Sequence, residues 1–415
     1  MKNLLYFEEF VSPLSKKLEA RNDINVLKVR AVKTINKFFS KEELMEQNVY
    51  YFDTEKDYDT EIKKFKEWLD KENITLDCFL NDSEYYMEIA NHIAHSLDLP
   101  CLSFEQVKWV RDKVDMKDKF NEIGLSTVDY APIESKDDII DFFYKNNCQT
   151  IIFKPRRAMN SMNVYKIESV KDITDLDIEI TPNKYMVETF CYGHEWSIES
   201  LVQDGIVLDS YLTYLPNATI WASIENKLHA HMTCINQPDY FDMMPKEYIQ
   251  KIVDGFGLKN GTMTIEIFVM PNGSIIASEL GWRLPGGHAC ENHSLSYGFD
   301  IWNSLIDIAI GKKVNLKYSD IKKCVGTLNL PNLEGIIKYV TPLKQLLSYD
   351  GVIDGELFAI PGEFQKKRRV GSDCSGWVQV CGTDTLDVLK KMQVVYDNFT
   401  IEVAKDKCNV RRLKK

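Results

Sequence analysis

Two glutamates, Glu266 and Glu279, are the residues of this chain whose type and spacing point most directly to chemistry. Residues 263–267 alternate between apolar and polar side chains, residues 271–273 have the Pro-Asn-Gly composition of a turn, and a second apolar run begins at residue 275. This pattern predicts a β-hairpin with the two glutamates at corresponding places on neighbouring strands. Like charges on adjacent strands are unfavourable unless a cation lies between them. Two such carboxylates suit Mg²⁺, which also takes oxygens from water and from a bound nucleotide.

Arg283 follows the second glutamate by four residues. A guanidinium group offers a planar fork of donors that matches phosphate oxygens, so we expect Arg283 to face phosphate rather than carboxylate. The hairpin alone also fits two solvent-facing glutamates with no ligand. Its function therefore depends on what the rest of the chain brings to it.

Length and composition limit the class of protein. At 415 residues the chain is too long for one ordinary core, so two or three domains are expected. Its 44% hydrophobic and 27% charged residues are typical of a soluble globular protein, and its net charge of −11 argues against nucleic-acid binding. The apolar run at residues 4–7 is too short for an export signal or a membrane span, and the ten cysteines form no CxxC pair. We therefore expect a cytoplasmic protein with free thiols and no membrane partner.

Residues 1–110 alternate between strand and helix patterns, which favours an open α/β sheet. His92 and His95 have a spacing that can hold a metal, but no Cys or carboxylate completes a ligand set, so we interpret them as helix-surface histidines. The segment also has no GxGxxG fingerprint of dinucleotide binding. Strands are predicted at residues 24–29, 49–52 and 76–80, and helices at 58–71 and 84–97.

Two lysines of the next part of the chain belong to predicted elements, one to a helix and one to a strand. Residues 108–124 have the pattern of one charged amphipathic helix that contains Lys113. Strands are predicted at residues 150–155, which carry Lys154 near their end, and at residues 164–167. A lysine that enters a short loop between antiparallel strands can lie over phosphates.

A nearly unbroken apolar strand is predicted at residues 185–191, and Glu195 follows it. The edge of such a strand can offer backbone groups to a flat base, and an acid beyond it can accept hydrogen bonds from ribose hydroxyls. Each of these fragments is weak evidence when taken separately.

Together these segments resemble the nucleotide-binding motifs of the ATP-grasp superfamily, over roughly residues 110–310. The resemblance implies that Glu266 and Glu279 bind Mg²⁺, with Mn²⁺ as a compatible substitute, and that Arg283 acts with Glu279 in catalysis. The other residues that match ATP-binding positions are Lys113, Lys154, Ser161, Glu188, Thr189, Phe190, Cys191 and Glu195. In the family pattern both lysines contact the nucleotide, Ser161 belongs to the phosphate loop, residues 188–191 face adenine, and Glu195 binds ribose.

The resemblance also implies an α/β chain with the ATP-grasp fold. Its parts would be an open α/β N-terminal domain at residues 1–110, the two lobes of a nucleotide clamp at 111–190 and 191–310, and a C-terminal lobe at 311–415. Within the last part, strands are predicted at residues 326–330, 335–340 and 378–382, and a helix at 385–395.

Two departures from the family pattern bear on the site. No glycine occurs between Lys154 and Val164, although Asn163 can adopt a positive φ, and Arg156 or Arg157 could supply charge to the loop. Gly281 stands where many members have an asparagine that completes the metal shell, and water can fill that place for Mg²⁺.

The run Pro285-Gly286-Gly287 is similar to one in ligases that join an amino-acid carboxylate to an amine. That subgroup resemblance implies phosphorylation of the carboxylate by ATP, release of ADP, and attack of an amine acceptor on the acyl phosphate. One similar ligase charges glutamate onto an acyl carrier protein in butirosin-type antibiotic biosynthesis, so a carrier thiol is an alternative acceptor. A nucleotide-binding regulator without turnover is a further alternative, because of the missing loop glycines and Gly281.

Three histidines and one basic run extend this interpretation. His229 and His231 lie on one face of a predicted strand, and His288 follows the two glycines, so we expect them near the acceptor. Ordinary hydrogen-bonded histidines are the alternative. The run from Lys366 to Arg369 is the dense basic patch of an acidic chain, either a solvated loop or a docking surface for an acidic carrier protein.

Overall fold

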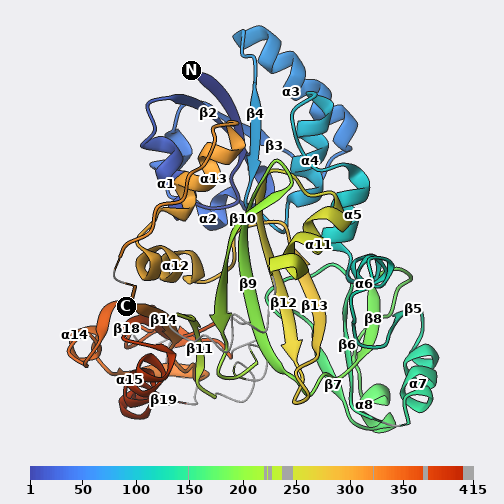
Figure 1. The fold of residues 1–415 in the computed structure, drawn as a ribbon, viewed down its shortest axis with the longest axis vertical. Coiled ribbons are helices and arrows are strands. Elements are labelled where there is room, and N and C mark those ends of the chain that lie inside the picture. Colours follow the sequence, from blue (N-terminus) through green and yellow to red (C-terminus); the bar gives the residue numbers. More distant parts are fainter. Residues whose placement is uncertain are drawn as a thin grey trace, which may run out of the picture.

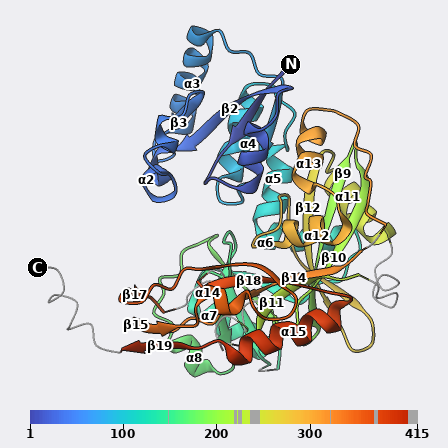
Figure 2. The same ribbon diagram turned by 90° about the vertical axis from the view of Figure 1, so that its left-hand side faces the viewer.

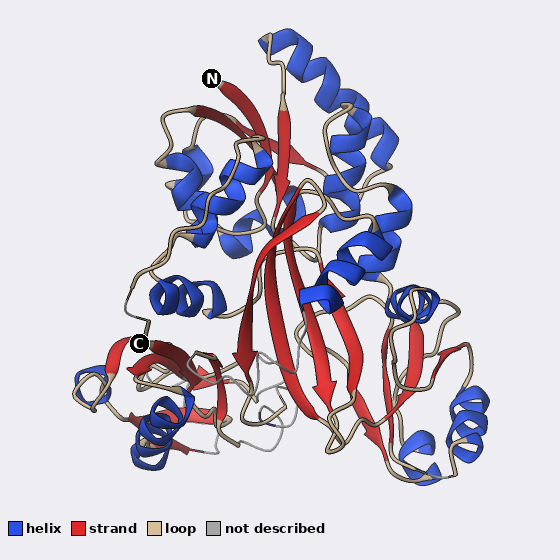
Figure 3. Ribbon diagram, viewed as in Figure 1, coloured by secondary structure: helices blue, strands red, loops and turns tan. Residues whose placement is uncertain are grey.

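The computed structural model describes residues 1–147, 149–218, 222, 227–235, 246–320, 322–367 and 373–404. Figure 1 shows the N-terminal domain above a long central sheet, with a smaller sheet on each side of its lower end. Figure 2 shows the same arrangement from the side, and Figure 3 separates the helices from the strands.

The N-terminal domain is an open parallel sheet. Its strands are β1 (Lys2–Phe7), β2 (Ile24–Ala31), β3 (Val49–Phe52) and β4 (Cys78–Asn81), in the order β3-β2-β1-β4. The strand order reverses between β1 and β4, so the carboxyl ends of these two strands border the crevice where open α/β sheets bind ligands. The predicted open α/β arrangement is therefore present, but the sequence interpretation missed β1, whose apolar residues 4–7 were considered only as an export or membrane segment.

Helices cover both faces of this sheet. On one face, α3 (Tyr58–Glu72) and α4 (Met87–Ser96) pack against a core that includes Leu27, Val29 and Phe52. On the other face, α1 (Pro13–Glu19) packs with α13 (Ile301–Ala309), a helix from far along the chain. Ion pairs Lys17–Asp300 at 2.5 Å and Arg21–Asp307 at 2.7 Å join these two segments. Short helical turns complete the domain at η1 (Val32–Thr34), α2 (Ile35–Phe38) and η2 (Glu43–Met45).

The single helix predicted at residues 108–124 is wrong. The segment forms α5 (Phe104–Arg111) and α6 (Lys113–Glu122), which meet at Asp112. Asp112 has an extended backbone, and its side chain accepts hydrogen bonds from Val114 and Asp115, so it caps the second helix. The break turns α6 so that its first residue, Lys113, lies against the loop after Lys154, where its backbone N–H donates to Arg156 O.

The lobe that follows is an antiparallel sheet with two helices. Its strands are β5 (Tyr130–Ile133), β6 (Ile151–Pro155), β7 (Tyr165–Ile167) and β8 (Tyr185–Thr189), in the order β5-β8-β6-β7. The helices α7 (Lys136–Lys145) and α8 (Val170–Thr174) cover one face of it, with Ile139, Phe143 and Ile173 in the shared core. Figure 1 shows this lobe at the lower right, beside the hairpin of the central sheet.

The central sheet is antiparallel and has the order β13-β12-β9-β10-β11-β14-β18-β16 in the described part of the chain. Its strands are β9 (His194–Gln203), β10 (Ile206–Tyr214), β11 (His229–Thr233), β12 (Gly261–Val269), β13 (Ile275–Gly281), β14 (Cys324–Asn329), β16 (Val352–Leu357) and β18 (Gly376–Gly382). The expected boundary at residue 310 thus falls between strands of one sheet, since β14, β16 and β18 extend it. The domain ranges themselves remain predictions.

Alternation along β9 separates the two faces of the central sheet. Trp196, Ile198 and Val202 pack against α11 (Lys246–Phe256) and α6, whereas Glu195, Ser197 and Glu199 line a cavity on the opposite face. The helices α12 (Ala289–Tyr297) and α15 (Thr385–Asn398) contribute to the core near β11, β14 and β18. A small C-terminal sheet, β17-β15-β19, contains β15 (Gly335–Val340), β17 (Phe364–Gln365) and β19 (Ile401–Ala404), with α14 (Leu343–Leu346) nearby in sequence.

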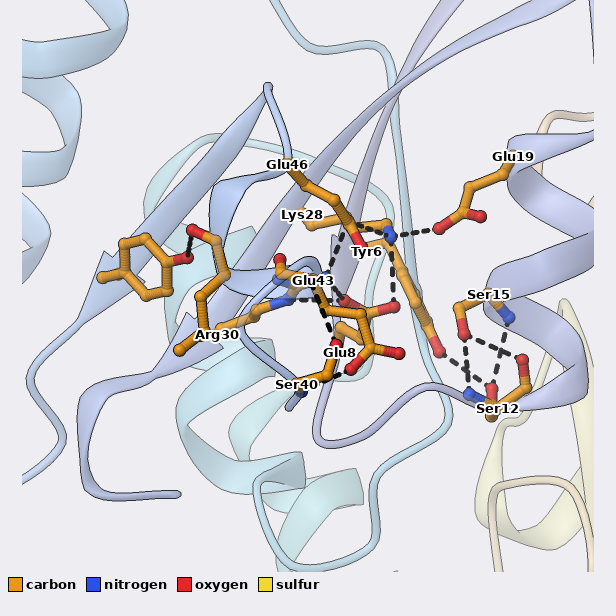
Figure 4. A network of polar contacts seen from close by, with 12 residues as sticks. Tyr6, Glu8, Ser12, Ser15, Glu19, Lys28, Arg30, Ser40, Glu43 and Glu46 are labelled. Carbon is orange, nitrogen blue, oxygen red and sulfur yellow. Dashed lines mark hydrogen bonds and ion pairs between the residues drawn. The ribbon is translucent and has the colours of Figure 1, made fainter. Parts of the chain in front are cut away.

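A buried charge network fixes one face of the N-terminal sheet (Figure 4). Arg30 on β2 and Glu8 after β1 are both fully buried and form an ion pair at 2.6 Å. Glu46 bridges Arg30 at 2.7 Å and Lys28 at 2.8 Å, and Lys28 also pairs with Glu19 of α1. The network ties the segment that contains η2 to the sheet.

Replacing Arg30 should destabilise the protein strongly, because Arg30→Met leaves the Glu8 carboxylate buried without its closest cation. Breaking one partner of a buried pair costs about 3–5 kcal/mol. Chemical denaturation should show this loss, whereas Lys33→Ala, which breaks an exposed pair with Glu55, should leave the unfolding free energy almost unchanged. Equal losses in the two variants would contradict the structural role of the network.

Candidate functional site

A cavity of about 1040 Å³ lies between the N-terminal domain, the 111–190 lobe and the central sheet. Phe10 and Glu84 border it from the ends of β1 and β4, as the crevice argument expects. All of the site residues predicted from the sequence line this one cavity: Lys113, Lys154, Ser161, Glu188, Thr189, Phe190, Cys191, Glu195, Glu266, Glu279 and Arg283. The roles assigned to them remain predictions, but the fold brings them together.

The hairpin places its two glutamates in the predicted register, because Glu266 on β12 pairs directly with Glu279 on β13. Burial and the neighbouring charge of Glu279 raise the pKa of Glu266 to about 8. Burial would also raise the pKa of Glu279, but the charges of Lys113 and Lys154 outweigh it and hold that pKa well below its ordinary value. The ligand-free pair therefore keeps one protonated and one ionised carboxyl group near neutral pH.

Lysines from the 111–190 lobe compensate the ionised glutamate. Lys154 Nζ lies 2.9 Å from Glu279 Oε1 and 2.6 Å from Glu188 Oε1. Lys113 Nζ lies 3.3 Å from Glu279 Oε2 and donates to Ala158 O at 2.9 Å. Burial works against the charge of Lys154, but the two glutamates outweigh it and raise its pKa. Lys154 thus stays protonated, and both amino groups lie where they can bind anionic oxygens.

Lys117 is a third cavity lysine that the sequence interpretation missed. Its Nζ lies 3.1 Å from Glu188 Oε2 and 3.1 Å from Thr127 Oγ1. Burial lowers its pKa, and the attraction of Glu188 opposes this only in part. Its position four residues after Lys113 places both on one face of α6, a signal that could have identified it.

The predicted hinge residues lie along the cavity at the end of β8 and just beyond it. Glu188, expected there to face adenine, directs its carboxylate to Lys117 and Lys154 instead. Burial opposes ionisation of Glu188, but these two lysines outweigh it and lower its pKa. Thr189, Phe190 and Cys191 line the wall, and a Cβ at the following Gly193 would approach Phe268 Cβ to 2.9 Å. This segment therefore depends on a glycine that allows close approach to the β12–β13 hairpin.

Arg283 is paired in this structure with a carboxylate, not directed at phosphate as expected. Its Nη2 lies 2.5 Å from Glu84 Oε2, and its Nη1 donates to Leu284 O at 2.8 Å. The other oxygen of Glu84 accepts from Arg111 at 2.7 Å. No sequence pattern identified Glu84, which follows β4 in the N-terminal domain. A Cβ at Gly281 would lie 3.6 Å from Arg283 Cγ, an ordinary van der Waals contact, so position 281 lies directly beside the arginine.

The loop after Lys154 has three non-glycine residues with positive φ. Asn160, Ser161 and Asn163 have φ of 54°, 56° and 55°, so asparagine and serine adopt the left-handed conformation that glycines provide in the family pattern. Arg156 and Arg157, which were expected to supply charge to this loop, are not among the residues that line the cavity.

Those two arginines instead hold the base of the loop. Arg156 Nε and Arg157 Nε donate to the two oxygens of Asp112 at 2.8 and 3.1 Å. The helix cap Asp112 and the two arginines therefore form one cluster, which couples the start of α6 to the loop after Lys154.

These residues fit ATP and a divalent cation. The raised pKa of Glu266 reflects two buried like charges that a divalent cation between them would relieve, and Lys113, Lys117 and Lys154 converge beside them. Within the described residues, no group of three or more His, Cys, Asp or Glu side chains could hold a metal. A cation at Glu266 and Glu279 would therefore take its remaining ligands from water and the nucleotide, as Mg²⁺ does.

The three predicted acceptor-side histidines line the same cavity. His229 is buried, and the rings of His288 and Trp377 lie 3.9 Å apart. Burial lowers the pKa of His231 to about 4, so this imidazole is neutral, and its buried Nε2 has no hydrogen-bond partner among the described residues. His92 and His95 contact Phe104 on the N-terminal domain, away from the cavity lining.

The described part of the chain bears on two further expectations, which concern the basic run at residues 366–369 and membrane-spanning segments. Lys366 and Lys367 of the basic run are exposed, whereas Arg368 and Arg369 lie outside the described residues. Among the described helices, none is long and apolar enough to cross a membrane.

Comparison with known proteins supports the fold. The L-amino acid ligase of Bacillus licheniformis superposes with a TM-score of 0.76 at 14% identity, over 97% of this chain and 99% of that one. A carboxyaminoimidazole ribonucleotide synthase from Aspergillus clavatus, solved in complex with ATP, gives a TM-score of 0.69 at 13% identity, over 95% and 97% of the two chains. The chain therefore has the ATP-grasp fold, which confirms the resemblance drawn from its sequence.

A sequence relative points in the same direction. The L-arginine-specific L-amino acid ligase of Bacillus subtilis is 22% identical over 313 residues, which are 73% of this chain and 74% of that protein. No protein-family model matches the chain.

The raised pKa of Glu266 predicts that, without bound metal or nucleotide, the free energy of unfolding depends on pH. Unfolding returns this carboxyl to its ordinary acidic pKa, so stability falls as the pH rises from about 5 towards 8. Glu266→Gln, which cannot ionise, should lack this part of the loss. Denaturation in EDTA at pH 5 and pH 8 measures the difference, with exposed Glu179→Gln as the control. The assignment is wrong if Glu266→Gln and Glu179→Gln show the same pH dependence as the unsubstituted protein.

Proposed function

We propose that this protein is an ATP- and Mg²⁺-dependent, ADP-forming ligase that activates an amino-acid carboxylate as an acyl phosphate and joins it to an amine. The observation that carries the proposal is the direct pairing of Glu266 with Glu279 inside a cavity that also receives Lys113, Lys154 and Arg283. The cavity is large enough for a nucleotide and further small substrates. The ATP-grasp fold and the amino-acid ligases among the similar proteins support it.

The protein's part in the reaction is positioning and charge compensation. Lys113, Lys117 and Lys154 would hold phosphate oxygens, and the loop around Ser161 would cover them. Held by Glu266 and Glu279, Mg²⁺ would supply the charge that stabilises the transferring phosphoryl group. Arg283 would exchange Glu84 for the reacting phosphate or the oxyanion of the second step, where a fork of donors at developing charge is most effective.

The second step needs an acceptor beside the activated carboxylate. Gly286 and Gly287 leave the backbone open beside the cavity, and a Cβ at Gly287 would approach His231 to 3.2 Å. Neutral His231, with its unpartnered Nε2, can accept a proton or a hydrogen bond from an amine. Walls on several sides would limit the access of water to the acyl phosphate.

Turnover should convert ATP to ADP and phosphate in the presence of an amino acid, because the site suits phosphoryl transfer to a carboxylate. Chromatography of the spent nucleotide checks this. Formation of AMP and pyrophosphate would rule out the acyl-phosphate route. ATP hydrolysis that no amino acid stimulates would favour the nucleotide-binding regulator.

Glu279→Gln should lower turnover by about a hundredfold or more, equivalent to ~2.7 kcal/mol of transition-state stabilisation. The substitution keeps the shape of the side chain but removes its negative charge, with which both lysines and the proposed cation interact. Steady-state kinetics at saturating Mg²⁺ measure the loss, and exposed Glu247→Gln is the matched control. A correctly folded Glu279→Gln protein with most of its activity would show that the pair does not bind the metal.

The alternative acceptor is the phosphopantetheine thiol of an acyl carrier protein. It rests on the basic run from Lys366 to Arg369, of which the two exposed lysines are described. The amine is preferred, because the cavity wall opposite the phosphate-binding lysines suits a small substrate with hydrogen-bond donors.

A further inference from the structure

Four side chains form a continuous row across the second half of the central sheet. His229 on β11 pairs in register with Asn329 on β14, Asn329 pairs with Trp377 on β18, and Trp377 pairs with Glu356 on β16. Directly opposed residues on neighbouring strands project from the same face of a sheet. All four line the cavity, so the row is a built surface of the site.

Contacts within the row give it a defined shape. Asn329 Nδ2 lies 3.3 Å from His229 Nδ1, and the Trp377 ring packs at 3.9 Å against His288. Phe358, two residues beyond Glu356 on the chain, is half exposed and also lines the cavity. Glu356 is exposed to the cavity and forms no ion pair with another described residue.

The two halves of the cavity differ in charge. The lysines and the arginine among its described lining residues, Lys113, Lys117, Lys154 and Arg283, all pair with Glu188, Glu279 or Glu84. The row contributes a carboxylate, an indole, an amide and a buried imidazole, with no cation of its own. Its chemistry therefore complements positive charge, whereas the other half complements phosphate.

We propose that the row His229–Asn329–Trp377–Glu356 is a specificity subsite for a positively charged side chain of one of the two amino acids that the ligase joins. This inference rests on the proposed function and adds the substrate class. An indole face attracts ammonium and guanidinium groups, and a carboxylate at its edge gives a charge-assisted hydrogen bond. The amide of Asn329 can accept a further N–H. An anionic phosphopantetheine arm would meet repulsion from Glu356.

The test compares kcat/KM for lysine or arginine with that for their neutral isosteres norleucine and citrulline, each offered as the acid and as the amine partner. The unsubstituted protein should prefer the cationic member by at least about tenfold in one of these positions, which is 1.4 kcal/mol. Glu356→Gln should reduce that preference to about threefold or less. Glu356→Lys should reverse it in favour of glutamate.

The matched control is Glu363→Gln, which removes the same charge from an exposed glutamate of the C-terminal part of the chain that does not line the cavity. It should keep the preference. Binding of lysine in the presence of ADP, measured by calorimetry, supplies a readout without turnover, and Glu356→Gln should weaken it by a similar factor.

The outcomes of these experiments distinguish a failure of the subsite proposal from a failure of the proposed ligase function. Turnover with no preference for charge, or a preference that survives Glu356→Gln, overturns the subsite and leaves the ligase. No amino-acid-stimulated release of ADP overturns the ligase, and retained charge-selective binding of lysine would then still support the subsite. Loss of preference in Glu363→Gln as well would assign the effect to general surface charge and overturn the role of the row.

Discussion

The constraint on which the site depends is the register of one hairpin, which places two carboxylates side by side on adjacent strands. Such a pair cannot be ionised twice in a buried place without compensation. In this structure, part of the compensation comes from Lys113 and Lys154, which belong to a different lobe. The position of that lobe against the central sheet therefore depends on the same charges that would bind the nucleotide.

With this arrangement, binding of the proposed ligands would be an exchange of ion-pair partners. Lys154 forms ion pairs with Glu188 and Glu279. If phosphate oxygens replaced these carboxylates as partners of Lys154, Glu279 would become available to a metal ion. Arg283 forms an ion pair with Glu84 and would exchange this partner in the same way. Buried charges are costly without partners, and an exchange keeps each of them paired throughout. Glu84 gives the exchange a wider consequence, because release of Arg283 would loosen a contact between the N-terminal domain and the hairpin.

Local patterns predicted much of this site, since alternation and a Pro-Asn-Gly turn determine the hairpin, and the positive φ of Asn163 follows from the side chain of asparagine. What the sequence could not show are contacts between distant segments, such as Glu84 with Arg283 or α13 with α1. The helix break at Asp112 could be predicted only in part. An aspartate before a helical segment is a capping signal, but the arginines that hold it come from the loop some 45 residues later.

The large sheet explains how one cavity could combine the proposed phosphoryl transfer with the proposed binding of a positively charged side chain. Strand register carries Glu279, Glu266 and Ser197 across β13, β12 and β9, and a second row carries His229, Asn329, Trp377 and Glu356 across β11, β14, β18 and β16. Hydrogen bonding between strands fixes the distance between the two rows more rigidly than loops would. An acyl phosphate formed at the first row would then meet its partner at a distance set by the sheet, which is the kind of preorganisation that bimolecular bond formation requires.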